Sequence, residues 1–306
     1  MKILVTGGAG FIASHITDAY IKAGHIVHIM DNLSTGKIEN INPNATFYNC
    51  DITSKEARDI IEEQKYDVIS HHAAQMDVRV SVKDPIFDAT ANILGSLNIF
   101  EAARNSGVKK IIFASSGGTI YGEQDNFPAA EEDATRPCSP YGISKLSVEK
   151  YLFYYKDSYG LDYVSHRYGN VYGRRQNPNG EAGVVAIFVN KMLKGEQPII
   201  NGDGLITRDY IYIDDVVSAN LIALDEKVSG IYNVATAREI NVNHIFNSIK
   251  SILNSDIEEN HGPAKVGEQR RSVCSIEKYK EMHGFEPKFS FEEGLKQTIE
   301  DFKQKG

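Results

Sequence analysis

The sequence predicts an α/β fold in which a doubly wound parallel sheet is followed by a smaller C-terminal α/β domain. Short apolar runs alternate with amphipathic stretches over the first two-thirds of the chain, and a glycine-rich turn follows the first apolar run. At 306 residues, the chain is also longer than a single hydrophobic core usually extends. Alternation of this kind predicts βαβ units, which bind ligands beyond the carboxyl ends of their strands.

The predicted strands are short apolar segments that follow one another along the chain. They span residues 2–5, 26–30, 45–49, 68–70, 110–114 and 163–166. Between them, apolar residues recur about every 3.6 positions, which is the period of a helix that buries one face. This recurrence predicts helices over about residues 11–23, 54–64, 85–106 and 139–159.

The regular alternation ends near Gly169, where a second domain is expected to begin. The segment RRQNPNGEAG, from Arg174, is rich in loop residues and leads to a helix predicted at 184–194. A strand at 209–213, the helix after it and a strand at 231–234 are expected to rejoin the first sheet. The first domain would then comprise residues 1–169 and about 208–236, and the second about 170–207 and 237–306.

Charge and hydropathy argue against two classes of partner. The formal net charge of −8 is unfavourable for a nucleic-acid surface, which must neutralise phosphates with clustered Lys and Arg. No apolar run reaches the length needed to span a bilayer. The N-terminal segment MKILVTGGAGF reaches its glycines too soon to hold the apolar core of a signal peptide. We therefore expect a cytoplasmic protein.

Cysteines and histidines do not form a recognisable metal or disulfide pattern. Cys50, Cys138 and Cys274 are far apart and odd in number, so neither a disulfide framework nor paired zinc ligands are predicted. His71 and His72 are adjacent on a predicted strand, so their side chains point to opposite faces. We expect no metal site.

The glycine-rich turn has the spacing of a dinucleotide-binding loop. Gly8, Gly10 and Ala13 form a GxGxxA motif directly after the first strand, and Gly7 adds a second glycine spacing with Gly10. Glycines let the backbone approach a pyrophosphate, and the helix that begins near Phe11 offers free N–H groups to it. Taken alone, the motif could also be an incidental glycine-rich turn.

A carboxylate in the expected place strengthens the interpretation and selects NAD. Asp31 ends the second predicted strand, about twenty residues after the glycines, where it can accept hydrogen bonds from the adenosine ribose. A 2′-phosphate would meet that negative charge, and Asn32 stands where an NADP enzyme would have Arg. Asp51 and Ile52, after the third strand, are placed to frame the adenine. Together these features predict a Rossmann-type domain that binds NAD.

Tyr141 and Lys145 form a candidate catalytic pair. They are four residues apart in a predicted helix, so their side chains share one face, and Pro140 fits the first turn of that helix. A free tyrosine has a pKa of about 10. To remove a hydroxyl proton near neutral pH it needs neighbouring cations, which Lys145 and an oxidised nicotinamide would supply. The spacing alone could arise by chance.

Several longer segments resemble the extended short-chain dehydrogenase/reductases over almost the whole chain. They are TGGAGFIASH from Thr6, DNLSTG from Asp31, HHAAQ from His71 and RYGNVYG from Arg167. SSGGTIYG from Ser115, NGDG from Asn201 and TRDYIYIDD from Thr207 resemble the UDP-glucose 4-epimerase branch and its nearest sugar-nucleotide relatives. The resemblance implies a homodimeric enzyme of galactose metabolism. This enzyme would invert carbon 4 of a UDP-sugar through a transient 4-keto sugar, without net redox change.

The resemblance also assigns site residues. For NAD it implies Gly7, Gly10, Phe11, Ile12, Asp31, Asn32, Ser34, Thr35, Gly36, Asp51, Ile52, Ala73, Ala74, Gln75, Asn92, Tyr141, Lys145 and Tyr168. For the UDP-sugar it implies Ser116, Tyr141, Asn170, Val184, Asn201, Arg208, Lys265, Glu268 and Ser272. Tyr141 would act as the base, and Lys145 would also hold the nicotinamide ribose.

Four positions depart from the family pattern or set specificity within it. Ala13 replaces the third glycine, and Gly117 stands where the family has a catalytic Ser or Thr. Ser116 is the first candidate for the lost hydroxyl, Thr119 or a water the next, although Ser116 could simply cap the strand end. Lys265 replaces a phosphate-binding Arg and lacks its two-pronged guanidinium. Arg270 or Arg271 could help to bind the phosphate, or both could belong to a solvated loop. A small gate residue, Ser272, would admit N-acetylated UDP-sugars.

Three alternatives remain to be weighed at this point. A sugar-nucleotide dehydratase would need an Asp-Glu pair where this chain has Gly118 and Thr119. A UDP-glucuronate epimerase or decarboxylase differs mainly in contacts to carbon 6 and stays open. A catalytically silent NAD-sensing regulator would have lost the pair formed by Tyr141 and Lys145, which are both present.

Overall fold

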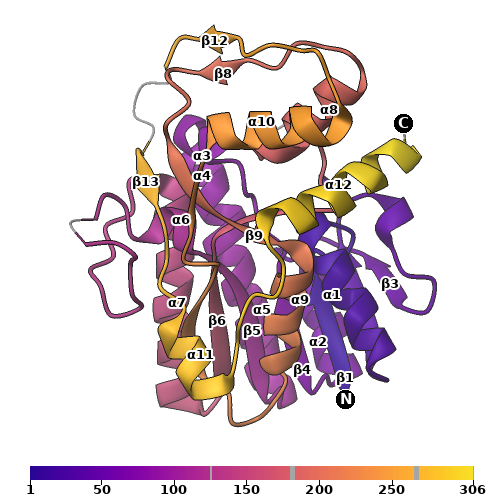
Figure 1. Cartoon of the computed structure of the whole chain (residues 1–306). Helices are drawn as coiled ribbons and strands as arrows, with labels where there is room; N and C mark the ends of the chain where they lie inside the picture. The colour runs from indigo at the N-terminus through magenta and orange to yellow at the C-terminus, as the bar shows by residue number, and fades with distance from the viewer. Residues whose placement is uncertain (125, 180–182, 265–268, 306) are drawn as a thin grey trace.

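The computed structural model describes residues 1–124, 126–179, 183–264 and 269–305, and its centre is a parallel sheet of seven strands (Figure 1). The strand order is β10-β6-β5-β4-β1-β2-β3. The strands are β1 (Lys2–Thr6), β2 (Ile26–Asp31), β3 (Thr46–Asn49), β4 (Val68–His71), β5 (Lys110–Ser116), β6 (Asp162–Tyr168) and β10 (Gly230–Val234). The order reverses between β1 and β4, and such a switch point opens a crevice at the carboxyl ends.

Helices cover both faces of this sheet, so its strands are apolar on both sides. On one face, α1 (Phe11–Lys22) packs against α9 (Ile213–Ile222), and Ile3 and Val5 of β1 belong to their core. On the other, α2 (Lys55–Gln64), α5 (Gly95–Ser106) and α7 (Pro140–Tyr159) cover Leu4. The predicted doubly wound sheet is confirmed, with strand and helix ends within two residues of the expected ones.

The helix predicted over 85–106 is a run of three pieces. They are α4 (Pro85–Ala89), a π-helical turn labelled η2 (Thr90–Leu94) and α5, and the short α3 (Val78–Lys83) precedes them. A π-helical turn inside a helix often marks a functional site. Here it contains Asn92, one of the residues assigned to the cofactor.

A second, smaller layer lies above the carboxyl ends of the large sheet, at the top of Figure 1. Its strands are β7 (Asn170–Tyr172), β9 (Thr207–Tyr212), β11 (Glu239–Asn241) and β13 (Arg271–Ser272), with a separate pair formed by β8 (Ile200–Asn201) and β12 (His261–Gly262). Its helices are α8 (Val184–Leu193), α10 (Val242–Leu253) and α12 (Phe291–Lys305). The helix α11 (Glu277–His283) lies instead against β10 of the large sheet, at the lower left of Figure 1. The short elements η1 (Ile38–Asn40) and α6 (Gly117–Ile120) complete the fold.

One expected strand belongs to a different sheet from the one predicted. The segment predicted at 209–213 is β9, and it pairs with β7, β11 and β13 instead of extending the large sheet. Only β10 rejoins the large sheet, beside β6. An apolar strand carries no local information about its partner, so the pattern predicted the strand and not its neighbours. The domain boundaries at 169, 207 and 236 stay a prediction.

Across the described part of the chain, none of the helices has both the length and the apolar composition that crossing a membrane requires.

Candidate active site

The turn after β1 is built so that only glycine fits. Gly7 has φ +72°, and a Cβ atom there would lie 2.8 Å from the backbone nitrogen of Ala73, which follows β4. The Gly10 N–H donates to the carbonyl of Gly7 at 2.9 Å and closes the turn. Gly10 also caps α1 without a side chain, so the first N–H groups of the helix, beginning at Phe11 and Ile12, face outward. Such groups form an anion site.

Asp31, at the end of β2, is held beside this turn. Its Oδ2 accepts from the Ala9 N–H at 3.0 Å and its Oδ1 from the Leu33 N–H at 2.8 Å. Burial raises the pKa of Asp31, and these two hydrogen bonds oppose the rise. A Cβ atom at Gly36 would lie 2.8 Å from Oδ1, so the loop that carries Ser34 and Thr35 folds closely over the carboxylate.

The residues assigned to the adenine lie next to one another. The Asn32 side chain donates to Asp51 Oδ2 at 2.7 Å, which ties the segment after β2 to the segment after β3. Ile52 packs against α5, since a Cβ atom at Gly95 would lie 2.7 Å from its Cδ1. The structure therefore brings Asp31, Asn32 and the pair Asp51–Ile52 together at one edge of the crevice.

Asn92 clamps the segment that follows β4. Its Oδ1 accepts from the Gln75 N–H at 2.8 Å, and its Nδ2 donates to the Gln75 carbonyl at 2.9 Å. This pair of hydrogen bonds fixes the 73–75 segment, which includes Ala73 and Ala74, against the π-helical turn. Sequence reasoning assigned these residues to the cofactor and did not foresee that one holds the other.

Lys145 is buried between β5 and Tyr141. Its Nζ donates to the Ala114 carbonyl at 2.8 Å and lies 4.8 Å from the centre of the Phe113 ring and 5.7 Å from that of Tyr141. Burial lowers the pKa of Lys145 to about 8, while the carboxylates of Asp88 and Glu149 oppose that shift. The predicted pair is thus assembled at the carboxyl end of β5, with the ammonium next to the phenol ring.

Local signals explain why α7 begins where it does. Ser139 Oγ accepts from the Gly142 N–H at 3.2 Å, and Pro140 occupies the first turn. A Cβ atom at Gly142 would lie 2.9 Å from the Thr119 carbonyl, so a glycine lets α7 approach α6 closely. This approach brings Tyr141 to the end of β5.

The hydroxyl missing at position 117 has two candidates in place. A Cβ atom at Gly117 would lie 2.7 Å from Cys274 Sγ, so a Ser or Thr side chain has no room there. Thr119 Oγ1 is buried and finds no hydrogen-bond partner among the described residues. Ser116 ends β5, and its side chain makes no capping hydrogen bond to α6. A Cβ atom at Gly118 would lie 4.0 Å from Ser116 Oγ and 3.5 Å from Asn170 Oδ1, which places these two groups on one side of α6.

Two buried carboxylates behind this pair were not foreseen. Glu149 forms a two-point ion pair with Arg167, at 2.7 and 3.0 Å, and accepts from Ser115 Oγ at 2.7 Å. Asp88 accepts from Gln75 Nε2 at 2.9 Å and from Ser144 Oγ at 2.6 Å. When only the sequence is known, charged residues of a helix are usually placed on its solvent-exposed face. The available signal was that Asp88 lies four residues before Asn92, to which it also bonds at 3.0 Å.

The substrate residues come from the small sheet. In β9, Arg208 pairs with Ile240 of β11 on one side and with Ser272 of β13 on the other. Ser272 is buried, and the Arg208 guanidinium donates to the Thr207 carbonyl at 2.8 Å. Asn170 begins β7, which pairs with the other half of β9. Val184 is the first residue of α8 and Asn201 the last of β8.

Some assigned residues are placed differently or not described. Lys265 and Glu268 lie outside the described residues. Arg271 pairs with Glu239 at 2.7 Å, and exposed Arg270 lies 3.6 Å from Asp203, so both proposed substitutes for the family arginine already face a carboxylate.

Tyr168 points its phenol into the interior. Its hydroxyl accepts from Asn220 Nδ2 at 2.8 Å and lies 3.2 Å from His72 Nε2, while its ring stacks on that of His72. Its assignment to the cofactor stays a prediction. The described residues include no group of three His, Cys, Asp or Glu side chains that could hold a metal ion.

Residues 3–235 match the model of a protein family described as the NAD dependent epimerase/dehydratase family. The chain belongs to this family. The crystal structure of a UDP-glucose 4-epimerase from Thermotoga maritima with UDP-glucose is 48% identical, with a TM-score of 0.98 over 100% of this chain and 99% of the other. The UDP-glucose 4-epimerase from Thermus thermophilus, in complex with NAD, is 44% identical, with a TM-score of 0.94 and 99% of each chain covered.

A third solved epimerase extends the range of sugars among the similar proteins. The UDP-N-acetylglucosamine 4-epimerase from Methanobrevibacter ruminantium, in complex with UDP-N-acetylmuramic acid, is 38% identical, with a TM-score of 0.95 over 100% of this chain and 99% of the other. The resemblance of the sequence to the UDP-glucose 4-epimerase branch and the prediction of NAD are confirmed. The protein is an NAD-dependent enzyme of the epimerase family.

Proposed function

We propose that this enzyme inverts carbon 4 of UDP-sugars, with UDP-glucose and UDP-galactose as one substrate pair. One observation carries the proposal: Tyr141 and the Lys145 ammonium meet at the carboxyl end of β5, beside the crevice of an NAD-binding sheet. A base at this place can take the proton of a sugar hydroxyl and return it. The high similarity to solved UDP-glucose 4-epimerases supports the same reaction.

The residues at the crevice fit NAD. The outward N–H groups at the start of α1 suit a pyrophosphate, and the glycines at 7 and 10 leave room for it. The Asp31 carboxylate suits the two hydroxyls of an adenosine ribose and repels a 2′-phosphate. Bound there, NAD would supply the hydride acceptor for carbon 4 and, once reduced, the hydride donor, so that no net redox change results.

The side chains of the chain itself handle the proton. The Lys145 ammonium favours the phenolate of Tyr141 electrostatically, and the phenolate takes the proton of the 4-hydroxyl. Ser116 and Thr119 are the two side-chain candidates to orient that group. Thr119 Oγ1, which has no hydrogen-bond partner among the described residues, fits a role that the substrate completes. Tyr141 returns the proton after the 4-keto sugar has turned over.

The nucleotide end of the substrate would lie over the small sheet. We assign the pyrophosphate to Arg208 and Lys265 and the uridine ribose to Glu268, with Asn170, Val184 and Asn201 around the sugar and the nucleotide. An acidic protein needs such local cations to hold two phosphate charges.

Ser272 sets the size of the sugar that fits, by its position beside Arg208 in the small sheet. We propose that this small residue admits N-acetylated UDP-sugars. Ser272→Tyr should then abolish turnover of UDP-N-acetylglucosamine and leave UDP-galactose turnover within a few-fold of the original enzyme. If the original enzyme converts UDP-galactose and fails with UDP-N-acetylglucosamine at high concentration, the proposal is wrong.

We also propose a homodimer. Exposed apolar side chains gather on α4, η2 and α7, which pack against one another: Ile86 is 79% exposed, Phe153 62% and Leu94 57%. Apolar surface of this kind marks an interface. Ile86→Glu should yield monomers in size-exclusion chromatography with light scattering, whereas Ile38→Glu, at an isoleucine elsewhere that is 70% exposed, should not. If the original protein is a monomer, the proposal is wrong.

We also propose that the enzyme acts in galactose metabolism in the cytoplasm.

The decisive experiment uses Tyr141→Phe and a panel of UDP-sugars resolved by chromatography. The variant should keep NAD and lose about 10²–10⁴-fold in turnover, because the base disappears while the other contacts stay. Near-normal turnover would refute the role of Tyr141. The panel includes UDP-glucuronate, whose epimerisation or decarboxylation by the original enzyme, without turnover of UDP-galactose, would select the alternative reaction. Bound NAD with no turnover of any sugar would select a regulatory protein.

A further inference from the structure

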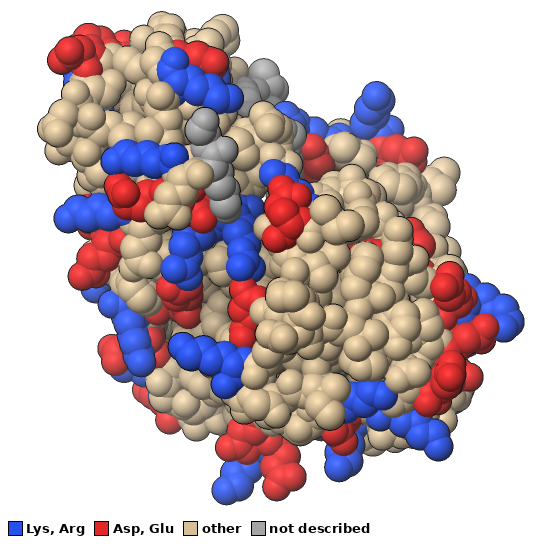
Figure 2. Space-filling view, turned by 90° about the vertical axis from the view of Figure 1, so that its right-hand side faces the viewer, with Lys and Arg blue, Asp and Glu red and all other residues tan. Residues whose placement is uncertain are grey.

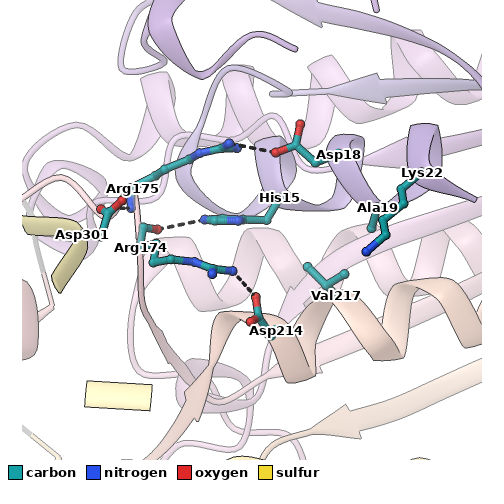
Figure 3. Close-up of a pocket in the computed structure, with 9 residues that line it drawn as sticks. All are labelled: His15, Asp18, Ala19, Lys22, Arg174, Arg175, Asp214, Val217 and Asp301. Carbon is teal, nitrogen blue, oxygen red and sulfur yellow. Dashed lines mark hydrogen bonds and ion pairs between the residues drawn. The ribbon is translucent and has the colours of Figure 1, made fainter. Parts of the chain in front are cut away.

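A cavity of about 460 Å³ lies on the outer side of α1, apart from every residue assigned to NAD or the UDP-sugar. On the face that Figure 2 turns to the viewer, basic and acidic side chains gather around a hollow. The residues that line the cavity come from α1, the segment after β7, α9 and α12 (Figure 3). They are His15, Asp18, Ala19, Lys22, Arg174, Arg175, Asp214, Val217 and Asp301.

The fixed charges of this cavity balance. Arg174 pairs with Asp214 at 2.6 Å, and Arg175 pairs with Asp18 at 2.8 Å. His15 Nε2 lies 2.9 Å from the Arg174 carbonyl, to which it donates. Burial lowers the pKa of His15 to about 4, so its ring is neutral near pH 7. Three cations therefore face three carboxylates, so an anion gains little from the net charge of the cavity and depends on the individual donors that it contacts.

Two donors at the cavity have no partner among the described residues. Arg175 Nη1 is buried and has no hydrogen-bond partner among the described residues. Lys22, in the last turn of α1, has no ion-pair partner in the part of the chain that the structure describes, and Figure 3 shows its amine directed into the cavity. A buried, unpaired guanidinium N–H is costly, which makes an acceptor at this point favourable.

The backbone of Arg175 is strained, and it places this guanidinium in the cavity. Arg175 has φ +62°, in the left-handed region that residues with a Cβ atom seldom occupy. Asp301 Oδ2 accepts from its N–H at 3.0 Å and so helps to hold the conformation. Strain of this kind persists where surrounding contacts enforce it, and it often accompanies a binding function.

We propose that the cavity binds a small phosphomonoester that carries hydroxyl groups. The phosphate would accept from Lys22 and from the guanidinium groups of Arg174 and Arg175, which line the same cavity. Three phosphate oxygens match several converging donors better than a single carboxylate does. The hydroxyls would donate to Asp214 and Asp18, whose carboxylates retain acceptor capacity beside their arginines. The small side chains of Ala19 and Val217 leave room for the carbon skeleton.

A ligand here would join four parts of the chain. α1 begins at the NAD site, and the 174–175 segment follows β7, which starts with Asn170. A bound phosphomonoester would therefore link α1 and α9 to α12 and to this segment, and it would stabilise the folded chain by mass action.

The test measures binding by isothermal titration with NAD and UDP in excess, so that the cofactor and nucleotide sites are filled. The probes are glycerol 3-phosphate, inorganic phosphate and glycerol. Glycerol 3-phosphate should bind most tightly, inorganic phosphate more weakly and glycerol undetectably. Lys22→Gln should weaken glycerol 3-phosphate binding about tenfold, through loss of a charge-assisted hydrogen bond. The matched control is Lys191→Gln, in the last turn of α8, which should bind like the original protein.

A second variant separates the two halves of the ligand. Asp214→Asn should reduce the preference for glycerol 3-phosphate over inorganic phosphate, because it removes an acceptor for the hydroxyls while it frees Arg174 and strengthens the attraction for phosphate. No saturable binding of glycerol 3-phosphate at millimolar concentration, or equal binding by the Lys22 and Lys191 variants, would overturn the site. Equal affinity for phosphate and glycerol 3-phosphate in the original protein would overturn the proposed ligand class. Unfolding temperatures without ligand show that each variant is folded.

Discussion

Two regions of this molecule assemble charged side chains, and they differ in what those charges contact. Behind β5 and α7, Glu149 and Asp88 are almost fully buried, and each accepts several hydrogen bonds from neighbouring strands and helices. At the outer cavity of α1, the ion pairs of Arg174 and Arg175 are about one-third exposed, and Lys22 has no partner among the described residues.

The difference indicates two kinds of role. A buried charge with all its partners in the protein fixes the position of its neighbours, and it is expensive to disturb because no water replaces the lost contact. A half-exposed charge with unused donors adds little to stability and remains available to a ligand. Substitutions behind β5 should therefore act on folding and turnover, and those at the outer cavity on binding alone.

The largest effect is expected from Arg167→Met. This change leaves the Glu149 carboxylate buried without its cation, which should lower the free energy of unfolding by about 3–5 kcal/mol. Urea denaturation followed by circular dichroism measures the loss. Arg104→Met is the control, because the ion pair of Arg104 with Glu101 is one-third exposed and should contribute at most about 1 kcal/mol. Equal losses for both variants would contradict the comparison.

Gly117→Ser is expected to have the next largest effect. It restores the hydroxyl of the family pattern, but its Cβ atom would lie 2.7 Å from Cys274 Sγ, so we expect a loss of about 1–3 kcal/mol in unfolding free energy without a gain in turnover. Gly118→Ser is the matched control, since the nearest atom to a Cβ there is 3.5 Å away. A stable Gly117→Ser enzyme with raised turnover would show that the hydroxyl belongs at 117 and that neither Ser116 nor Thr119 replaces it.

The sequence predicted the features that depend on neighbouring residues and missed those that depend on contacts between distant segments. The turn after β1 and the carboxylate beside it were predictable because Gly7, Gly10 and Asp31 stand in the chain in the order in which the fold brings them together. The obstacle at Gly117 was not, because the atom that fills the space belongs to Cys274, far along the chain. The partners of β9 and the pairing of Arg208 with Ser272 likewise depend on long-range contacts that no local pattern specifies.

Asp88→Asn should change the pH profile of turnover more than its maximum. The Asp88 carboxylate raises the pKa of Lys145 against the effect of burial, so its removal should move that pKa below about 8. Neutral lysine no longer favours the Tyr141 phenolate, and the alkaline limb of kcat should therefore shift to lower pH by up to about one unit. Asp59→Asn, at an exposed ion pair on α2, is the control and should leave the profile unchanged. A lower maximum with an unmoved limb would mean that Asp88 acts only through packing.

The smallest effect is expected from Lys22→Gln in the absence of any added anion. Because Lys22 is exposed and has no partner among the described residues, its loss should change the unfolding free energy by no more than about 0.5 kcal/mol and leave turnover of UDP-galactose unaltered. Thermal unfolding and a standard assay measure both. A marked loss of stability would place the outer cavity with the region behind β5, as a structural network of charges. An unchanged variant would show that folding and turnover do not depend on the Lys22 ammonium, as expected for a group that has no partner among the described residues.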